Sequence, residues 1–206
     1  MPLVRRDPAT PPAPAFPTSS LEDLGDPDPE VRRRTVRGLA GDPGAVKPLG
    51  RAYGMERDPT VREAILTSLV RIGGPAAVEA ILPYLGSDDA ALRTGALDAL
   101  RNIPDALDRL PSLLDDPDPD LRILAAEIAR SMPAASGAAL LCRHLEGERD
   151  PNVCATALDV LAEIGGPYCL PTLQACAERF EAEPFLRYAA GVAIARIAGP
   201  QATGTS

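Results

Sequence analysis

An internal repeat of about 31 residues constrains this chain more than any other feature of its sequence. Six segments share an acidic residue, a proline after it in most cases, and a Val or Leu three residues after the acidic one. These apolar positions are Val31, Val61, Leu92, Leu121, Val153 and Leu186, separated by 30, 31, 29, 32 and 33 residues. Such a period predicts a solenoid, in which each unit packs only against its neighbours.

Each segment also predicts where a helix begins. An Asp side chain accepts hydrogen bonds from the free amides of a first helical turn, and Pro is tolerated next because its missing N–H would be unpaired there. The acidic residues are Asp28, Asp58, Asp89, Asp118, Asp150 and Glu183. Ala90 replaces the Pro in one segment, where Ser87, Asp88 and Asp89 can all act as caps. In the last five segments apolar residues then recur four, eight and eleven positions after the Val or Leu, on one helical face.

A second apolar segment lies between successive helices of this kind, so each repeat is expected to hold a helix pair. We call the first kind B helices and the second kind A helices. The A helices are expected at 45–55, 76–85, 106–114, 136–145 and 168–180, with a shortened one at 19–24. The prediction is an all-α protein, a right-handed α-α superhelix of about five full helix pairs plus a truncated N-terminal one, over 19–199. The Pro-rich residues 1–18 and residues 200–206 are expected to be disordered tails.

The composition agrees with this fold and narrows the class of partner. The chain is 45% hydrophobic with only 3% aromatic residues and no Trp, so we expect a core of Leu, Ile, Val and Ala. A net charge of −8 disfavours a protein that coats nucleic-acid phosphates and favours a protein partner. No segment is apolar enough for a secretion signal or a membrane span. We therefore expect a cytoplasmic protein with reduced cysteines and no membrane partner.

The first B helix is an exception to the acidic balance, because it contains Arg32, Arg33, Arg34 and Arg37. Nucleic-acid binding is one interpretation, but no aromatic residues alternate with these cations to stack on bases. A charged cap that keeps the open end of the solenoid soluble explains them equally well. We expect no nucleic-acid partner.

The repeat, with its Asp-Pro-x-Val start and its Ile-Gly end, is clearest over 58–73 and 150–165. It resembles the short bacterial HEAT-like repeat named after the phycobiliprotein lyases, and the resemblance covers roughly residues 21–198. The resemblance implies the solenoid fold but not one function, because such repeats occur in scaffolds, adaptors, lyase subunits and hydroxylases. A di-iron hydroxylase of this class resembles a protein whose site is built from paired His-Glu motifs on several helices. This chain has one His and cannot supply such a site.

An Arg follows the Val or Leu in five of the repeats, as Arg32, Arg62, Arg93, Arg122 and Arg187. An anion-binding ladder is one interpretation. The resemblance to HEAT-like proteins favours a structural role, in which the Arg bridges loop Asp residues along the stack. Each such pair would stabilise by only ~0–1 kcal/mol if exposed.

All four cysteines and the only histidine lie near the fifth repeat, as Cys142, His144, Cys154, Cys169 and Cys176. A metal or thiol site is one interpretation. The stretch has no Cys-x-x-Cys pair, and Cys142 and His144 are two residues apart, so they point to different faces of a helix. Apolar neighbours favour buried small side chains. We expect no metal and no cofactor; Cys154, which replaces the repeated Arg, would matter if exposed.

A solenoid usually binds its partner on one extended face, and we expect this site on the concave face of the B helices. The predicted partner-binding residues are Arg33, Arg37, Glu63, Thr67, Asp98, Arg101, Ile123, Glu127, Arg130, Asp159, Glu163 and Tyr188. Among them Asp98, Glu127 and Asp159 recur at one repeat position, and packed helices roughly 10 Å apart would align them into an acidic stripe.

Two interpretations of this stripe stay open. Arg101 and Arg130 each follow an acid by three residues, so Asp98 and Glu127 can form ordinary pairs on a solvated helix surface. Asp159 has no such basic neighbour and is followed by Glu163, so its charge is expected to be uncompensated. In the second interpretation the stripe is a groove for a partner.

Together these features predict a non-catalytic protein–protein interaction module, that is a scaffold, adaptor or regulator without catalytic residues. Its partner is expected to supply a basic or mixed-charge segment, with Ile123 and Tyr188 as apolar anchors. The alternative is a lyase-like subunit or chaperone that handles a tetrapyrrole or another cofactor on a client protein.

Overall fold

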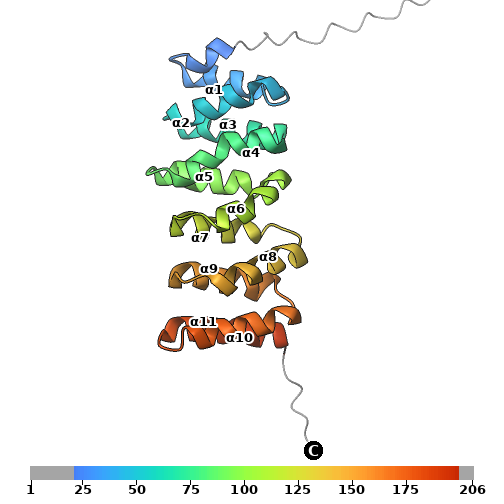
Figure 1. Ribbon diagram of the computed structural model, residues 1–206. Coiled ribbons are helices and arrows are strands. Elements are labelled where there is room, and N and C mark those ends of the chain that lie inside the picture. Colours follow the sequence, from blue (N-terminus) through green and yellow to red (C-terminus); the bar gives the residue numbers. More distant parts are fainter. Residues whose placement is uncertain (1–20, 200–206) are drawn as a thin grey trace, which may run out of the picture.

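The computed structural model describes residues 21–199, which form a single stack of helices (Figure 1). Both expected tails, and the first two residues of the shortened A helix at 19–24, lie outside the described residues. Within 21–199 every regular element is a helix and no strand occurs. The predicted all-α solenoid is confirmed.

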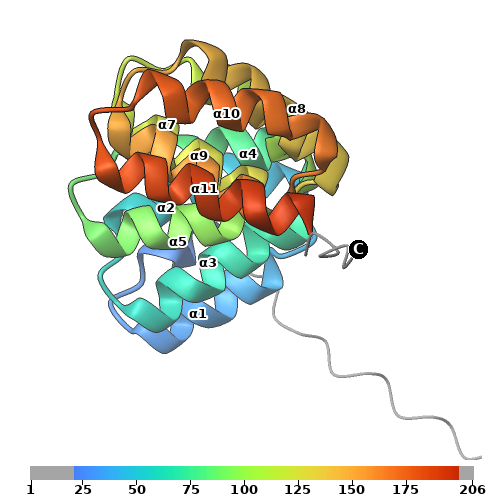
Figure 2. The same cartoon turned by 90° about the horizontal axis from the view of Figure 1, so that it is seen from below.

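The B helices form one layer of the stack. They are α1 (Pro29–Gly38), α3 (Pro59–Ile72), α5 (Ala90–Leu100), α7 (Pro119–Ala129), α9 (Pro151–Ile164) and α11 (Pro184–Ala198). Each contacts the next B helix along the chain. Viewed along the stack, α1, α3 and α5 lie on one side, and α8 and α10 lie on the other (Figure 2).

The A helices form the second layer, and most of them include a 3-10 turn. They are η2 (Pro43–Ala45) with α2 (Val46–Met55), α4 (Gly74–Ile81) with η3 (Leu82–Gly86), η4 (Pro104–Arg109) with α6 (Leu110–Leu114), α8 (Ala134–Gly147), and η5 (Pro167–Cys169) with α10 (Leu170–Arg179). Pro83 accounts for the change from α4 to η3, because it cannot donate the hydrogen bond that would continue the α-helix. The first repeat contributes η1 (Leu21–Gly25). Five full pairs and one truncated pair are therefore present, as predicted.

Side-chain caps begin five of the six B helices. Asp28, Asp58, Asp89, Asp118 and Asp150 each accept a hydrogen bond from a backbone amide two residues later. The Oδ1 atom of Asp58, for example, lies 2.8 Å from the amide nitrogen of Thr60. Glu183 makes no side-chain cap bond to α11. The predicted caps are confirmed for Asp and wrong for Glu183, whose longer side chain is not among those that favour this position.

The core lies between the two layers and is mostly aliphatic, as expected. Tyr53 is an aromatic exception: its side chain is buried and its hydroxyl donates to the carbonyl oxygen of Leu92 at 2.9 Å. Its ring meets that of Tyr84 edge to face, with centroids 5.0 Å apart. The Tyr84 hydroxyl donates in turn to the carbonyl oxygen of Gly50 at 2.7 Å. These two tyrosines join the second and third repeats in both directions.

Candidate protein-binding site

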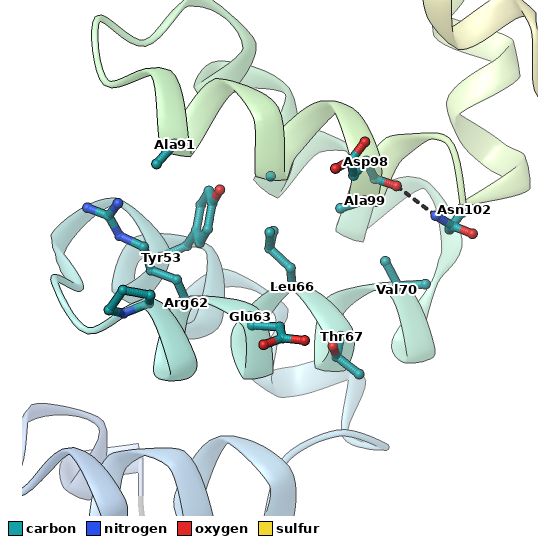
Figure 3. A pocket seen from close by; sticks show the side chains of 12 residues that line it. Tyr53, Arg62, Glu63, Leu66, Thr67, Val70, Ala91, Asp98, Ala99 and Asn102 are labelled. Atoms are coloured by element: carbon teal, nitrogen blue, oxygen red, sulfur yellow. Dashed lines mark hydrogen bonds between the residues drawn. The ribbon is translucent and has the colours of Figure 1, made fainter.

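A groove that could receive a ligand lies between α3 and α5 on the B-helix surface, and we call it the α3–α5 groove (Figure 3). Its volume is about 520 Å³. It is lined by Tyr53, Pro59, Arg62, Glu63, Leu66, Thr67, Val70, Ala91, Gly95, Asp98, Ala99 and Asn102. Apolar side chains therefore form most of its wall, and charged side chains stand at its edges.

Gly95 sets the shape of this groove. A Cβ atom at this position would collide with the Tyr53 hydroxyl and would lie 2.8 Å from a methyl group of Leu66. The absent side chain therefore lets Tyr53 and Leu66 fill the space between α3 and α5, as Figure 3 shows. Asn102 closes one end, where its side-chain amide donates to the carbonyl oxygen of Asp98 at 2.7 Å.

A second groove, the α1–α3 groove, lies next to the first and has a volume of about 450 Å³. It is lined by Arg33, Arg37, Ala40, Thr60, Glu63, Ala64, Thr67, Ser68 and Arg71. Glu63 and Thr67 line both grooves, so the two share one ridge on α3. The α1–α3 groove has three Arg residues on its walls and is the basic end of the face.

Farther along the stack, five ion pairs join α5, α7 and α9 into a continuous chain, which we call the ion chain. Arg101 contacts Asp98 at 3.6 Å and Glu127 at 2.6 Å. Arg130 contacts Glu127 at 3.3 Å and Asp159 at 2.9 Å, and it also pairs with Glu163. The hydrogen bond with Glu163 makes the largest contribution to raising the pKa of Arg130 above its ordinary value.

The expectation that Asp159 is uncompensated was therefore wrong. Its basic partner is Arg130, which comes from the neighbouring helix α7 and lies 29 residues earlier in the sequence. Within α9 itself no basic residue stands three or four positions from Asp159. The pattern within one helix could not reveal a pair that forms between repeats.

The structure divides the twelve predicted partner-binding residues into three sets. Five line the grooves: Arg33, Arg37, Glu63, Thr67 and Asp98. Asp98 belongs also to the ion chain, with Arg101, Glu127, Arg130, Asp159 and Glu163. The two expected anchors do not join them, because Ile123 is half-buried in α7 and Tyr188 lies exposed on the last helix.

Sequence reasoning missed the apolar wall of the α3–α5 groove. Leu66 and Val70 fit the helical apolar pattern and are therefore indistinguishable from core residues by spacing. Gly95 was the available signal, because a Gly in the middle of a helix marks close approach or a packing requirement.

The repeated Arg is built into the loops that precede the B helices. In four repeats it donates to the backbone carbonyl six residues earlier: Arg32 to Asp26 at 2.7 Å, Arg62 to Glu56 at 2.6 Å, Arg93 to Ser87 at 2.5 Å and Arg122 to Asp116 at 2.9 Å. These bonds fix each loop against its helix. They support the structural interpretation and not the anion ladder.

The same Arg side chains also bridge to the next repeat, but mostly not to Asp. Arg62 pairs with Asp89 at 3.2 Å, as expected. Arg32 instead pairs with Glu56 at 2.7 Å, and Arg122 pairs with Glu148 at 2.7 Å. Both glutamates are buried, and each also accepts hydrogen bonds from two backbone amides of its own loop.

These bonds change the acidity of both buried carboxyls. The hydrogen bond from Arg32 holds the pKa of Glu56 below its usual value. Burial opposes ionisation of Glu148, but hydrogen bonds from Arg122 and from the amides of Asp150 and Arg149 outweigh it, and its pKa is also lowered. His144 lies 3.0 Å from the Glu148 carboxylate; burial lowers the pKa of this imidazole and favours its neutral form.

All four cysteines are buried free thiols. Cys154, which stands in the Arg position of the fifth repeat, is fully inaccessible. The loop bond that an Arg would make there comes from Arg179 of α10, which donates to the carbonyl oxygen of Glu148 at 2.6 Å. Burial raises the pKa of Cys142 to about 12. A hydrogen bond with Cys176, together with burial, raises that of Cys154.

Residues 21–199 contain no group of three or more His, Cys, Asp or Glu side chains placed to hold a metal ion. Over the same range, no helix has both the length and the apolar character needed to cross a bilayer.

The first repeats of this stack match a known repeat family. Residues 18–101 match the family described as HEAT repeats. A relative from Pseudanabaena tenuis, described as "Uncharacterized phycocyanin operon protein Z", is 27% identical over 189 residues, which cover 86% of this chain and 93% of the relative.

Two solved structures are also similar to the chain. One is a crystal structure of an engineered protein, 21% identical with a TM-score of 0.42, covering 86% of this chain and 94% of that one. The other is human deoxyhypusine hydroxylase, 21% identical with a TM-score of 0.47, covering 86% and 72%. Residues 18–101 therefore carry HEAT repeats, and helix pairs of the same kind continue along the stack to α11.

Proposed function

We propose that this chain is a non-catalytic interaction module that binds an extended segment of a partner protein along the exposed face of its B helices. The α3–α5 groove carries this proposal. Its volume of about 520 Å³ and its mainly apolar wall suit the burial of one or two partner side chains. Solenoids in general bind through such extended surfaces, which their stacked repeats create.

The apolar wall gives the groove a place for an anchor residue. Leu66 and Val70 from α3 face Ala91 and Ala99 from α5 across it. Burial of apolar surface stabilises a complex by about 25 cal/mol per Å² before the entropy of association is subtracted. An aliphatic or aromatic side chain of the partner is the expected occupant.

The charges along the exposed face of the B helices indicate which partner residues flank that anchor residue. The α1–α3 groove presents Arg33, Arg37 and Arg71. At the other end, the ion chain contains four carboxylates and two guanidinium groups, which leaves a net charge of −2. The face is therefore polarised, and we expect a mixed-charge partner segment whose acidic end lies over α1 and whose basic end lies over α7 and α9.

The test is to fill the groove without disturbing the core. Thr67 is exposed and lines both grooves, so Thr67→Trp should block them while the thermal midpoint stays nearly unchanged. Ser136→Trp on α8 is the matched control, because Ser136 is also exposed but lies in the A layer. Proteins captured from native cells by wild type and Ser136→Trp should be lost with Thr67→Trp. Equal capture by all three would contradict the proposal.

One observation favours a second candidate. The Pseudanabaena relative is named for a phycocyanin operon, which agrees with the alternative of a lyase-like subunit or chaperone that handles a tetrapyrrole on a client protein. The buried thiols of this chain do not suit covalent attachment, so a tetrapyrrole would bind non-covalently in the α3–α5 groove. Titration with an open-chain tetrapyrrole should then change its visible absorption spectrum with wild type and not with Thr67→Trp. An unchanged spectrum with wild type would dismiss this candidate.

A further inference from the structure

The last B helix carries an apolar stripe that nothing in the described chain covers. Phe185, Tyr188 and Val192 of α11 are 67%, 72% and 41% exposed. With Ala195 they occupy positions i, i+3, i+7 and i+10, the spacing of a helix that packs lengthwise on another helix. The opposite side of α11 is already buried in the stack through Leu186, Ala190 and Ala193, which are at most 1% exposed.

The two ends of the stack differ in how they meet solvent. At the first end, α1 carries the exposed charged residues Glu30 and Arg34 outside the α1–α3 groove. Terminal repeats of a solenoid need such a polar outer surface to remain soluble as single chains. The free side of α11 lacks this protection.

The middle of the α11 stripe is unusually flat. The other five B helices have a larger side chain five positions after the Val or Leu, as Val36, Leu66, Leu97, Ala126 and Leu158. In α11 this position is Gly191, and a Cβ atom there would have no neighbour within 4 Å. A second helix could therefore approach α11 closely at its centre.

We propose that α11 packs antiparallel against α11 of a second copy of this chain and forms a two-fold symmetric dimer. In one antiparallel register, Tyr188 faces Val192 of the copy, and Phe185 then faces Ala195 of the copy. Each large side chain thus meets a smaller one, which is the complementarity that close packing requires. The stripe is therefore complementary in shape to the same stripe of the second copy in this register.

Charge favours the antiparallel direction. Glu181 and Glu183 precede α11, whereas Arg196 lies in its last turn. Antiparallel packing places the acidic end of one helix beside the basic end of the other and also opposes the two helix dipoles. The residues of this sequence after Gly199 include no Leu, Ile, Val, Met or aromatic side chain, so they cannot supply the missing apolar surface.

Sedimentation velocity of the full chain at about 1–100 μM tests the proposal. Wild type should sediment as a dimer that dissociates on dilution. Tyr188→Lys and Val192→Glu should each weaken association at least about tenfold. An equimolar mixture of these two variants should recover the dimer, because one Lys then faces one Glu while the other contact remains Tyr188 with Val192.

Tyr168→Lys is the matched control, because this exposed tyrosine lies in η5, away from the stripe, and its substitution should leave the dimer intact. A monomeric wild type would overturn the proposal, as would variants that still dimerise or a mixture that stays monomeric. Circular dichroism confirms that each variant folds. None of these outcomes bears on the grooves between α1 and α5, so the proposed function is tested separately.

Discussion

The N-terminal and C-terminal halves of the stack build the same repeat with different side chains. From α1 to α5 the exposed face is open and holds two grooves, whereas from α5 to α9 the ion chain bridges it. One repeat position explains the difference: nine residues after the Val or Leu, the first two repeats have Ala40 and Val70, and the next two have Arg101 and Arg130. Small apolar side chains leave a groove, and a long cation that reaches the next helix closes it.

The loops that precede the B helices also reach the same structure with different side chains. In the first repeats the loop is fixed by an Arg of its own B helix, while in the fifth repeat Cys154 takes that position and Arg179 of the A layer supplies the bond. Buried Glu56 and Glu148 nevertheless share two features in the two halves: each pairs with an Arg of the preceding repeat and accepts hydrogen bonds from two loop amides, although only Glu148 also has a His beside it. The fold requires the bond to the loop, and either layer can provide it.

The largest expected effect comes from removing the buried carboxylate of the C-terminal half. Glu148→Ala leaves the Arg122 guanidinium and two loop amides without their acceptor, and should lower the free energy of unfolding by about 3–5 kcal/mol. Glu56→Ala should have a comparable effect in the N-terminal half. Urea unfolding followed by circular dichroism measures both. If only one variant is destabilised, the two loops are not equivalent.

The pH dependence of wild type checks the same two groups. Folding lowers the pKa of Glu56 and Glu148, so their contribution to stability is complete above the ordinary Glu value and disappears as pH falls through the lower folded value. Stability should therefore decrease below about pH 4.5. The decrease should be shallower in Glu148→Ala, and an unchanged slope would contradict the assignment.

The second expected effect tests the exchange of Arg between layers. Arg179→Met removes the bond to the Glu148 carbonyl and should lower the free energy of unfolding by about 1–3 kcal/mol. Cys154→Arg restores the side chain that four other repeats use for this bond. In an Arg179→Met background it should recover part of the loss, whereas in wild type two cations would compete for one carbonyl. Additive effects in this double-mutant cycle would show that Arg179 does not replace the repeated Arg.

A smaller effect is expected at the centre of the ion chain. Arg130→Met removes contacts to Glu127, Asp159 and Glu163, and should cost about 1–2 kcal/mol at low salt and less at high salt. Unfolding measured at two salt concentrations tests this. The matched substitution Val70→Met at the same repeat position should show no salt dependence. A salt-independent loss at Arg130 would mean that its packing, and not its charge, closes the face.

The smallest effect compares two helix starts. Asp150→Ala removes a cap that accepts hydrogen bonds from the amides of Asn152 and Val153, and should cost about 1 kcal/mol. Glu183→Ala should cost only a few tenths, because Glu183 makes no cap bond. Thermal unfolding of the two variants side by side gives the difference. Equal losses would contradict the distinction between Asp and Glu at this position.

The sequence by itself determined the features that depend on neighbours a few residues apart. Asp caps, Pro at first turns and the helical apolar period act within one or two turns of a helix. They therefore predicted the six B helices, the A helix that pairs with each of them, and the all-α stack. The tertiary structure alone decided which side chains meet between repeats. Arg130 pairs with Asp159 across 29 residues, and Arg179 replaces the Arg missing at Cys154. Such pairs depend on how closely and at what rotation successive helices pack, and a repeat pattern fixes the order of the helices but not these distances.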